Sequence, residues 1–180
     1  RRAVQLGASH PDLEACNIRG NVDTRLRKVS DGQFDGVILA VAALKRLGWE
    51  DRICEYLPTE HFLPSAGQGA LGIETRSNDK EVVEIVLPLN CLDAWQSTSA
   101  ERAFLSALGG GCRAPIAALG VVNGTILRLE GMVADVRKRK IMHSSEEGTA
   151  AAPEELGISL AQKLLLMGAG KFLTEAGGER

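Results

Sequence analysis

The first third of the chain alternates apolar runs with amphipathic stretches. Residues 37–41 form a continuous apolar run, Val-Ile-Leu-Ala-Val, which is typical of a strand buried on both faces of a parallel sheet. Residues 15–18 predict a second, shorter strand. A helix capped by Asn21 or Asp23 is predicted between the two strands, and another helix is predicted over residues 42–47. This alternation predicts an α/β fold for the region.

The last half of the chain predicts a different, α+β arrangement. A helix is expected over residues 98–108 with Ser97 or Thr98 as its N-cap, and Thr98 and Glu101 have the spacing of a capping box. An Asn-Gly pair at residues 123–124 is a strong hairpin signal between two apolar runs. A final helix is predicted over residues 153–175 from its apolar stripe. The three predicted strands are residues 116–122, 125–135 and 138–144.

Glycine and proline separate these two regions. Residues 64–75 place glycines ahead of an apolar stretch, which is typical of a hinge that leads into a strand. Residues 79–87 predict a helix, and Pro88 ends it at a domain boundary. We therefore expect three parts, residues 1–63, 64–91 and 92–180.

Composition narrows the functional classes. An apolar fraction of 44% supports a buried core, and a formal net charge of −2 gives no reason to expect nucleic acid binding. The longest apolar run is far shorter than a membrane span. The cysteines form no Cys-x-x-Cys pair and have no histidine at metal-ligand spacing, so free thiols fit better than a zinc site or disulfides. The chain opens on arginine without a signal peptide pattern, and we expect it to be a segment of a longer chain.

Cys112 is the cysteine with the strongest indication of chemistry. It follows three glycines at residues 109–111, so its thiol can project from a loop that lacks bulky side chains. Arg113 and Arg102 would favour the thiolate form. The alternative is a helix end followed by a small buried cysteine, which is the more common outcome for this pattern alone.

Arginines are concentrated around the predicted strand-to-helix turns. Arg19 precedes such a turn, and Arg25 lies about one helical turn beyond Asn21. Ligands in open parallel sheets bind at the carboxyl ends of strands, and arginine binds carboxylates through paired hydrogen bonds. A site for a ligand with several anionic groups is therefore predicted, and solvated surface charge is the alternative. The arginines of this set are Arg1, Arg2, Arg19, Arg25 and Arg46.

Gln68 is a further candidate for ligand contact. It lies between Gly67 and Gly69, which would let the backbone approach a ligand, and its amide offers both a donor and an acceptor. A plain hinge explains the same residues.

Four segments of the chain form a combined sequence signature. They are residues 18–26 (IRGNVDTRL), 38–48 (ILAVAALKRLG), 63–70 (LPSAGQGA) and 110–116 (GGCRAPI). Together they resemble the hydroxymethylbilane synthase (porphobilinogen deaminase) family. They occur in the family's order and span nearly the whole chain, whereas a Gly-Gly-Cys sequence alone would be weak. The opening Arg1-Arg2 pair resembles the end of the family's Ser-Ser-Leu-Arg-Arg motif.

The resemblance implies a transferase of tetrapyrrole biosynthesis that condenses four porphobilinogen molecules into hydroxymethylbilane and releases ammonia. It implies a dipyrromethane cofactor that is attached to Cys112 through a thioether. It assigns Arg46 to the incoming substrate or to chain elongation. Cofactor and chain binding are implied for the remaining site residues, Arg1, Arg2, Arg19, Arg25, Ala40 and Gln68.

The implied fold has a periplasmic-binding-protein-like domain with a parallel or mixed sheet in residues 1–63. Residues 64–91 would return toward a first domain, and residues 92–180 would form a small α+β domain with a three-stranded antiparallel sheet that carries Cys112. The family's catalytic aspartate lies in the first domain. We therefore expect no catalytic residue here and no turnover by this chain alone.

The expected partners are porphobilinogen, the growing polypyrrole chain and the missing first domain. We expect a monomer that binds neither nucleic acid nor a membrane. The expected location is the cytoplasm, or an organelle if a transit peptide precedes the first domain. A non-catalytic two-domain module that binds anions is the alternative function.

Overall fold

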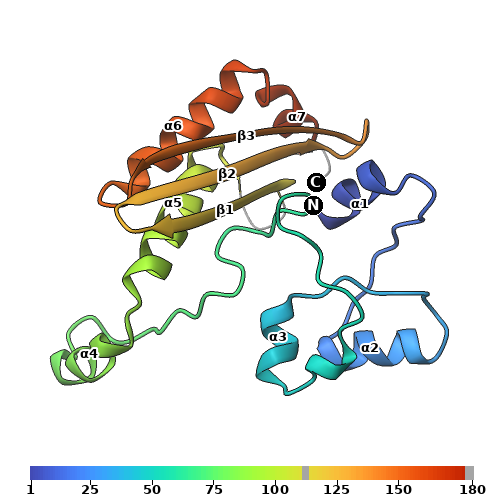
Figure 1. The fold of residues 1–180 in the computed structure, drawn as a ribbon, viewed down its shortest axis with the longest axis horizontal. Helices are drawn as coiled ribbons and strands as arrows, with labels where there is room; N and C mark the ends of the chain where they lie inside the picture. Colours follow the sequence, from blue (N-terminus) through green and yellow to red (C-terminus); the bar gives the residue numbers. More distant parts are fainter. Residues whose placement is uncertain (111–113, 177–180) are drawn as a thin grey trace.

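The C-terminal part of the molecule is a layered α+β unit. The computed structural model describes residues 1–110 and 114–176. Strands β1 (Ile116–Asn123), β2 (Ile126–Asp135) and β3 (Lys140–Thr149) form an antiparallel sheet in the order β1-β2-β3. Helices α5 (Leu92–Ala107), α6 (Pro153–Leu166) and α7 (Gly170–Ala176) pack on one side of this sheet (Figure 1). The predicted three-stranded antiparallel sheet is confirmed.

The main core lies between the sheet and these helices. Leu127 and Leu129 lie two residues apart in β2, so both side chains point toward the helices, and both are fully buried. Phe104 of α5 and Leu160 of α6 meet them in the same cluster. The packing is close, since a Cβ atom built on Gly131 would lie 2.5 Å from Cζ of Phe104. The layer therefore depends on a glycine in the middle of a strand.

A second, smaller core covers part of the opposite face of the sheet. Met132 and Ala134 of β2 pack there with Val4 of helix α1 (Arg2–Ser9) and with Leu63. These contacts join the start of the chain to its C-terminal layer.

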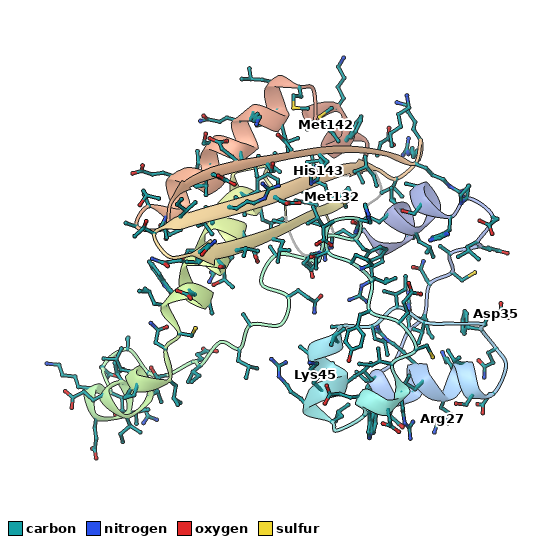
Figure 2. All side chains as sticks on the ribbon, viewed as in Figure 1. Arg27, Asp35, Lys45, Met132, Met142 and His143 are labelled. Atoms are coloured by element: carbon teal, nitrogen blue, oxygen red, sulfur yellow. The ribbon has the colours of Figure 1, made fainter. Side chains whose placement is uncertain are left out.

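The remaining N-terminal helices form a lobe below the sheet in Figure 1. The side chain of Asn21 caps the first of them by accepting a hydrogen bond from Thr24 N at 2.8 Å, which selects between its two predicted caps. This helix and the helix predicted over residues 42–47 are both confirmed. The lobe contains α2 (Val22–Ser30), α3 (Val41–Arg46) and the 3-10 helix η1 (Glu50–Arg52). In Figure 2, Arg27, Asp35 and Lys45 lie in the lobe, whereas Met132, Met142 and His143 lie on the sheet.

The two strands predicted in this region are absent from the described structure. Residues 15–18 and 37–41 run as irregular chain, and α3 already begins at Val41. A parallel strand is stable only when neighbouring strands complete its hydrogen bonds and helices cover its faces. The described residues offer no neighbouring strand to either run, and the side chains of residues 37–41 are only half-buried. Both strand assignments are wrong here, and the periplasmic-binding-protein-like sheet stays a prediction.

The segment between the lobe and α5 projects from the molecule (Figure 1). It contains α4 (Lys80–Val86), which confirms the helix predicted over residues 79–87, and the 3-10 helix η2 (Leu87–Leu89). Large apolar side chains are exposed along it, and Leu71 reaches 77%. Across the described residues, no helix combines the length and apolarity needed to cross a membrane.

Three element boundaries differ from the prediction. Helix α5 begins at Leu92, so Thr98 lies inside it and its hydroxyl donates to the carbonyl of Ala94 at 2.7 Å instead of capping the helix. The capping box is therefore wrong. The predicted final helix divides near Gly168, whose φ of +105° ends α6. Strand β3 continues to Thr149, past its predicted end near residue 144.

Candidate ligand-binding site

Three arginines gather where α1 approaches the lobe. Arg2 Nη1 donates to the carbonyl of Ile38 at 3.0 Å, and Arg25 Nε donates to the carbonyl of Gly20 at 2.8 Å. Burial lowers the pKa of Arg2, and the positive charges of Arg25 and then Arg1 lower it further. Because these like charges repel one another, an anion bound among them would stabilise the arrangement.

Arg1 also reaches the segment that follows the predicted attachment cysteine. Its Nη1 donates to the carbonyl of Ala114 at 3.0 Å and to that of Ile116 at 3.2 Å. Cys112 itself lies outside the described residues. Arg1 therefore connects the arginine group to the start of β1, and the attachment at Cys112 stays a prediction.

Arg46 bonds to the turn that contains Gln68 at a second point. Ala40 is the N-cap residue of helix α3, and Arg46 is the last residue of this helix. The Nη2 atom of Arg46 donates to the carbonyl of Gly69 at 2.8 Å. Gln68 is exposed on the turn that contains this glycine. The carbonyl that binds Arg2 lies shortly before Ala40, so α3 links the two groups.

Arg19 stands apart from these contacts. Its side chain is exposed at the turn before α2, and its carbonyl oxygen accepts a hydrogen bond from Lys28 Nζ at 3.3 Å. The other described residues of the predicted site are connected to one another, either as neighbours in the chain, through hydrogen bonds to backbone carbonyls or through nearby charges. They are Arg1, Arg2, Arg25, Ala40, Arg46 and Gln68.

Two buried polar side chains hold this arrangement and were not selected from the sequence as site residues. The amide of Gln5 donates to the Leu63 carbonyl at 3.0 Å and accepts from the Leu63 amide at 2.7 Å. The Glu101 carboxylate accepts from Gly67 N at 2.6 Å and from Gly120 N at 2.8 Å. Burial raises the pKa of Glu101, although the two hydrogen bonds oppose that shift. No short-range sequence pattern marks either residue, because their hydrogen-bond partners lie far away in the chain.

The charges of the site fit a ligand with several carboxylates. None of the described carboxylates forms an ion pair with Arg2, Arg25 or Arg46. A guanidinium group has about five N–H donors, so each keeps further donors after its bond to a backbone carbonyl. Within the described residues, no group of three or more His, Cys, Asp or Glu residues is suited to a metal ion. The donor set therefore matches a polyanion.

Two family models account for most of the chain. Residues 1–84 match the model described as "Porphobilinogen deaminase, dipyromethane cofactor binding domain", and residues 95–166 match "Porphobilinogen deaminase, C-terminal domain". The chain belongs to the porphobilinogen deaminase family. The resemblance found in the sequence is confirmed, and the arginine group lies within the part that matches the cofactor-binding domain of porphobilinogen deaminase.

Curated porphobilinogen deaminases are similar over nearly all of this chain. That of Roseiflexus castenholzii is 46% identical over 165 residues, which is 92% of this chain and 54% of the relative. That of Syntrophobacter fumaroxidans is 44% identical over 176 residues, 97% of this chain and 57% of the relative. That of Geobacter metallireducens is 46% identical over 175 residues, 97% of this chain and 55% of the relative. The chain thus spans about half the length of these relatives.

Proposed function

We propose that this chain supplies the cofactor-binding and chain-binding part of a hydroxymethylbilane synthase. The reaction condenses four porphobilinogen molecules into hydroxymethylbilane with release of ammonia, in tetrapyrrole biosynthesis. The observation that carries the proposal is the proximity of Arg2 and Arg25, neither of which forms an ion pair with a described carboxylate, inside the match to the dipyrromethane-binding domain. Each pyrrole unit adds two carboxylates, so a growing chain accumulates the negative charge that these arginines would neutralise.

The residues of this chain would divide the binding work. Arg1, Arg2 and Arg25 would hold carboxylates of the cofactor, because their positive charges are already close enough to lower the pKa of Arg2. Arg19 would join them from its exposed turn before α2. Ala40 and Gln68 would contact the cofactor, from the start of α3 and from the turn beside it. Arg46, at the other end of α3, would bind carboxylates of the incoming substrate.

Cys112 would hold the dipyrromethane through a thioether. When bound, this group supplies the primer to which substrate units are added. The other residues would orient the polycarboxylate and offset its charge.

The rest of the reaction would depend on chain that the relatives have in addition. Because this chain spans about half of their length, we propose that the catalytic aspartate lies in that additional part. Residues 1–63 would then belong to a periplasmic-binding-protein-like domain, residues 64–91 would return toward the first domain, and residues 92–180 would carry the cofactor. This chain alone would be inactive. A monomeric state and a cytoplasmic location stay predictions.

The proposal is tested by the mass of a full-length enzyme that contains residues 1–180, made in cells that supply porphobilinogen. We expect the intact mass to exceed the polypeptide mass by that of a dipyrromethane, and Cys112→Ala to remove the increase. An unmodified, folded wild-type protein would contradict the proposal and favour the non-catalytic module that binds anions.

The arginine group is tested with a matched pair of variants. Arg25→Leu should reduce cofactor loading several-fold with little change in the midpoint of thermal unfolding, because Arg25 is partly exposed and bonds to a carbonyl at a helix start. Arg27→Leu removes an exposed charge from the same helix and should leave loading unchanged (Figure 2). Equal loading in both variants would count against the assigned role of Arg25.

A further inference from the structure

Glu101 is a buried carboxylate that joins two distant parts of the chain. It is 5% exposed, and its two oxygens accept from the backbone amides of Gly67 and Gly120. Gly120 belongs to β1, which packs directly on α5. Gly67 belongs to the turn that contains Gln68, outside the C-terminal layer. Glu101 therefore fixes this turn against α5.

The same turn is held from its other side by Arg46. Its Nη2 donates to Gly69 O at 2.8 Å, while Glu101 Oε2 accepts from Gly67 N at 2.6 Å. The turn is tight, with Ala70 N donating to the carbonyl of Gly67 at 3.2 Å. Gly67 and Gly69 have positive φ angles, +72° and +92°, which residues with side chains rarely adopt. Only a few backbone torsions separate the Gly67 amide from the Gly69 carbonyl, so a displacement of one group changes the position of the other.

The surroundings of Glu101 favour a positioning role over other roles of a buried acid. None of the described cations forms an ion pair with it. Both oxygens already accept amide hydrogens, and the group is closed off from solvent, so it is unsuited to proton exchange with a ligand. Burying a carboxylate costs free energy unless hydrogen bonds offset that cost, and both donors that do so here are backbone amides, of Gly67 and Gly120.

We propose that Glu101 is a positioning residue for Arg46, acting through the Gly67–Gly69 turn. By fixing the Gly67 amide, Glu101 sets where the Gly69 carbonyl lies, and that carbonyl in turn holds the Arg46 guanidinium at the end of α3. The inference rests on the proposed function, in which Arg46 binds carboxylates of the incoming substrate. Arg46, the Gly67–Gly69 turn and Glu101 are far apart in the sequence, and hydrogen bonds connect them only in the folded chain.

The test is a double-mutant cycle in the full-length enzyme, read out as KM and kcat for porphobilinogen. Glu101→Gln replaces one acceptor oxygen with an NH2 group that cannot accept from an amide, and we expect KM to rise about tenfold. Cofactor loading, measured by mass, should stay intact. If Glu101 acts through Arg46, adding Glu101→Gln to Arg46→Gln should raise KM by less than about twofold more.

Phe104→Leu is the matched control, because it loosens the packing of the same helix without touching the bonds of Glu101. It should change KM by less than about twofold. Additive KM effects in the double variant, lost loading in Glu101→Gln, or an equal KM rise in Phe104→Leu would overturn the inference. If the wild-type enzyme neither loads the cofactor nor turns over, the proposed function fails first, which is a different result.

A second measurement applies if Glu101→Gln does not fold. Arg46 is exposed, so Arg46→Gln should fold, and amide hydrogen exchange can be compared at the two partners of Glu101. Coupling through the turn predicts that Gly67 N–H exchanges about tenfold faster while Gly120 N–H is unchanged. Unchanged exchange at Gly67 would overturn the inference.

Discussion

The part of the chain from Leu92 onward and the part before it are held together by different interactions. In the described residues, the later part has a core of buried apolar side chains between its sheet and helices. Before Leu92, the buried apolar side chains are Val4, Leu44 and Leu63. Of these, Val4 and Leu63 pack on the sheet of the later part rather than with the lobe. The earlier part relies on helix caps and on side chains that bond to backbone groups.

This difference matters because the candidate site uses both parts. The arginines of the site come from the weakly packed part, while Glu101 belongs to the densely packed part. Changes in the core should therefore alter the stability of the whole molecule. Changes in the lobe should alter the site while the sheet stays folded.

The largest expected effect comes from separating the two parts. Residues 92–180 alone should unfold cooperatively in denaturant, because their main core is self-contained. Residues 1–91 alone should show no cooperative transition, because their buried apolar contacts lie mostly with the sheet. Far-UV circular dichroism during urea unfolding checks both. A cooperative transition in residues 1–91 would show that this part has a core of its own and would contradict the difference between the two parts.

Core substitutions should have the next largest effect. Phe104→Ala removes a fully buried ring above Gly131 and should lower the free energy of unfolding by about 3–5 kcal/mol. Leu44→Ala is the counterpart in the lobe, since Leu44 is buried but belongs to neither core cluster. Its effect on the unfolding midpoint of the sheet, followed by urea titration, should be much smaller. Equal effects would mean that the two parts share one core.

A cap substitution should have a smaller, local effect. Asn21→Ala removes the acceptor for Thr24 N and should destabilise α2 by about 1 kcal/mol. Amide hydrogen exchange should quicken along α2 and stay unchanged in β2. Asn21→Asp keeps an acceptor at this position and should restore the protection. Faster exchange throughout the sheet would contradict the separation of the two parts.

The smallest expected effect is a pH dependence from Glu101. Burial raises its pKa in the folded state above the ordinary value of 4.5, so the folded state binds more protons than the unfolded state between those two values. The contribution of Glu101 to stability should therefore fall as pH rises from about 4.5 through the raised pKa, and level off above it. The measurement is the difference in unfolding free energy between wild type and Glu101→Gln across this range. A difference that grows more favourable to wild type with rising pH would contradict the raised pKa.

Local patterns predicted most helices and all three strands of the antiparallel sheet. These elements succeed because each carries its own signal: a cap at Asn21, and an Asn-Gly turn at residues 123–124 between two apolar runs. The strands at residues 15–18 and 37–41 failed because a parallel strand depends on neighbours that no local pattern reveals. The capping box failed because Thr98 has the right spacing but lies inside a longer helix.

The candidate site was only partly predictable from the sequence. Residue type and resemblance selected the arginines, since guanidinium groups are suited to carboxylates wherever they lie. Gln5 was missed, and Glu101 was interpreted as a cap, because their roles come from backbone partners far away in sequence. Such contacts follow from tertiary packing and carry no short-range pattern.

The carbonyl bonds of the arginines have a consequence for the thermodynamics of ligand binding. A free arginine side chain samples many rotamers, and immobilising such a side chain costs about 0.5–1.5 kcal/mol of conformational entropy. Arg2, Arg25 and Arg46 are each already restrained by a bond to a backbone oxygen. Much of that ordering therefore takes place when the protein folds, and a polyanion that arrives later meets guanidinium groups that are preorganised to receive it.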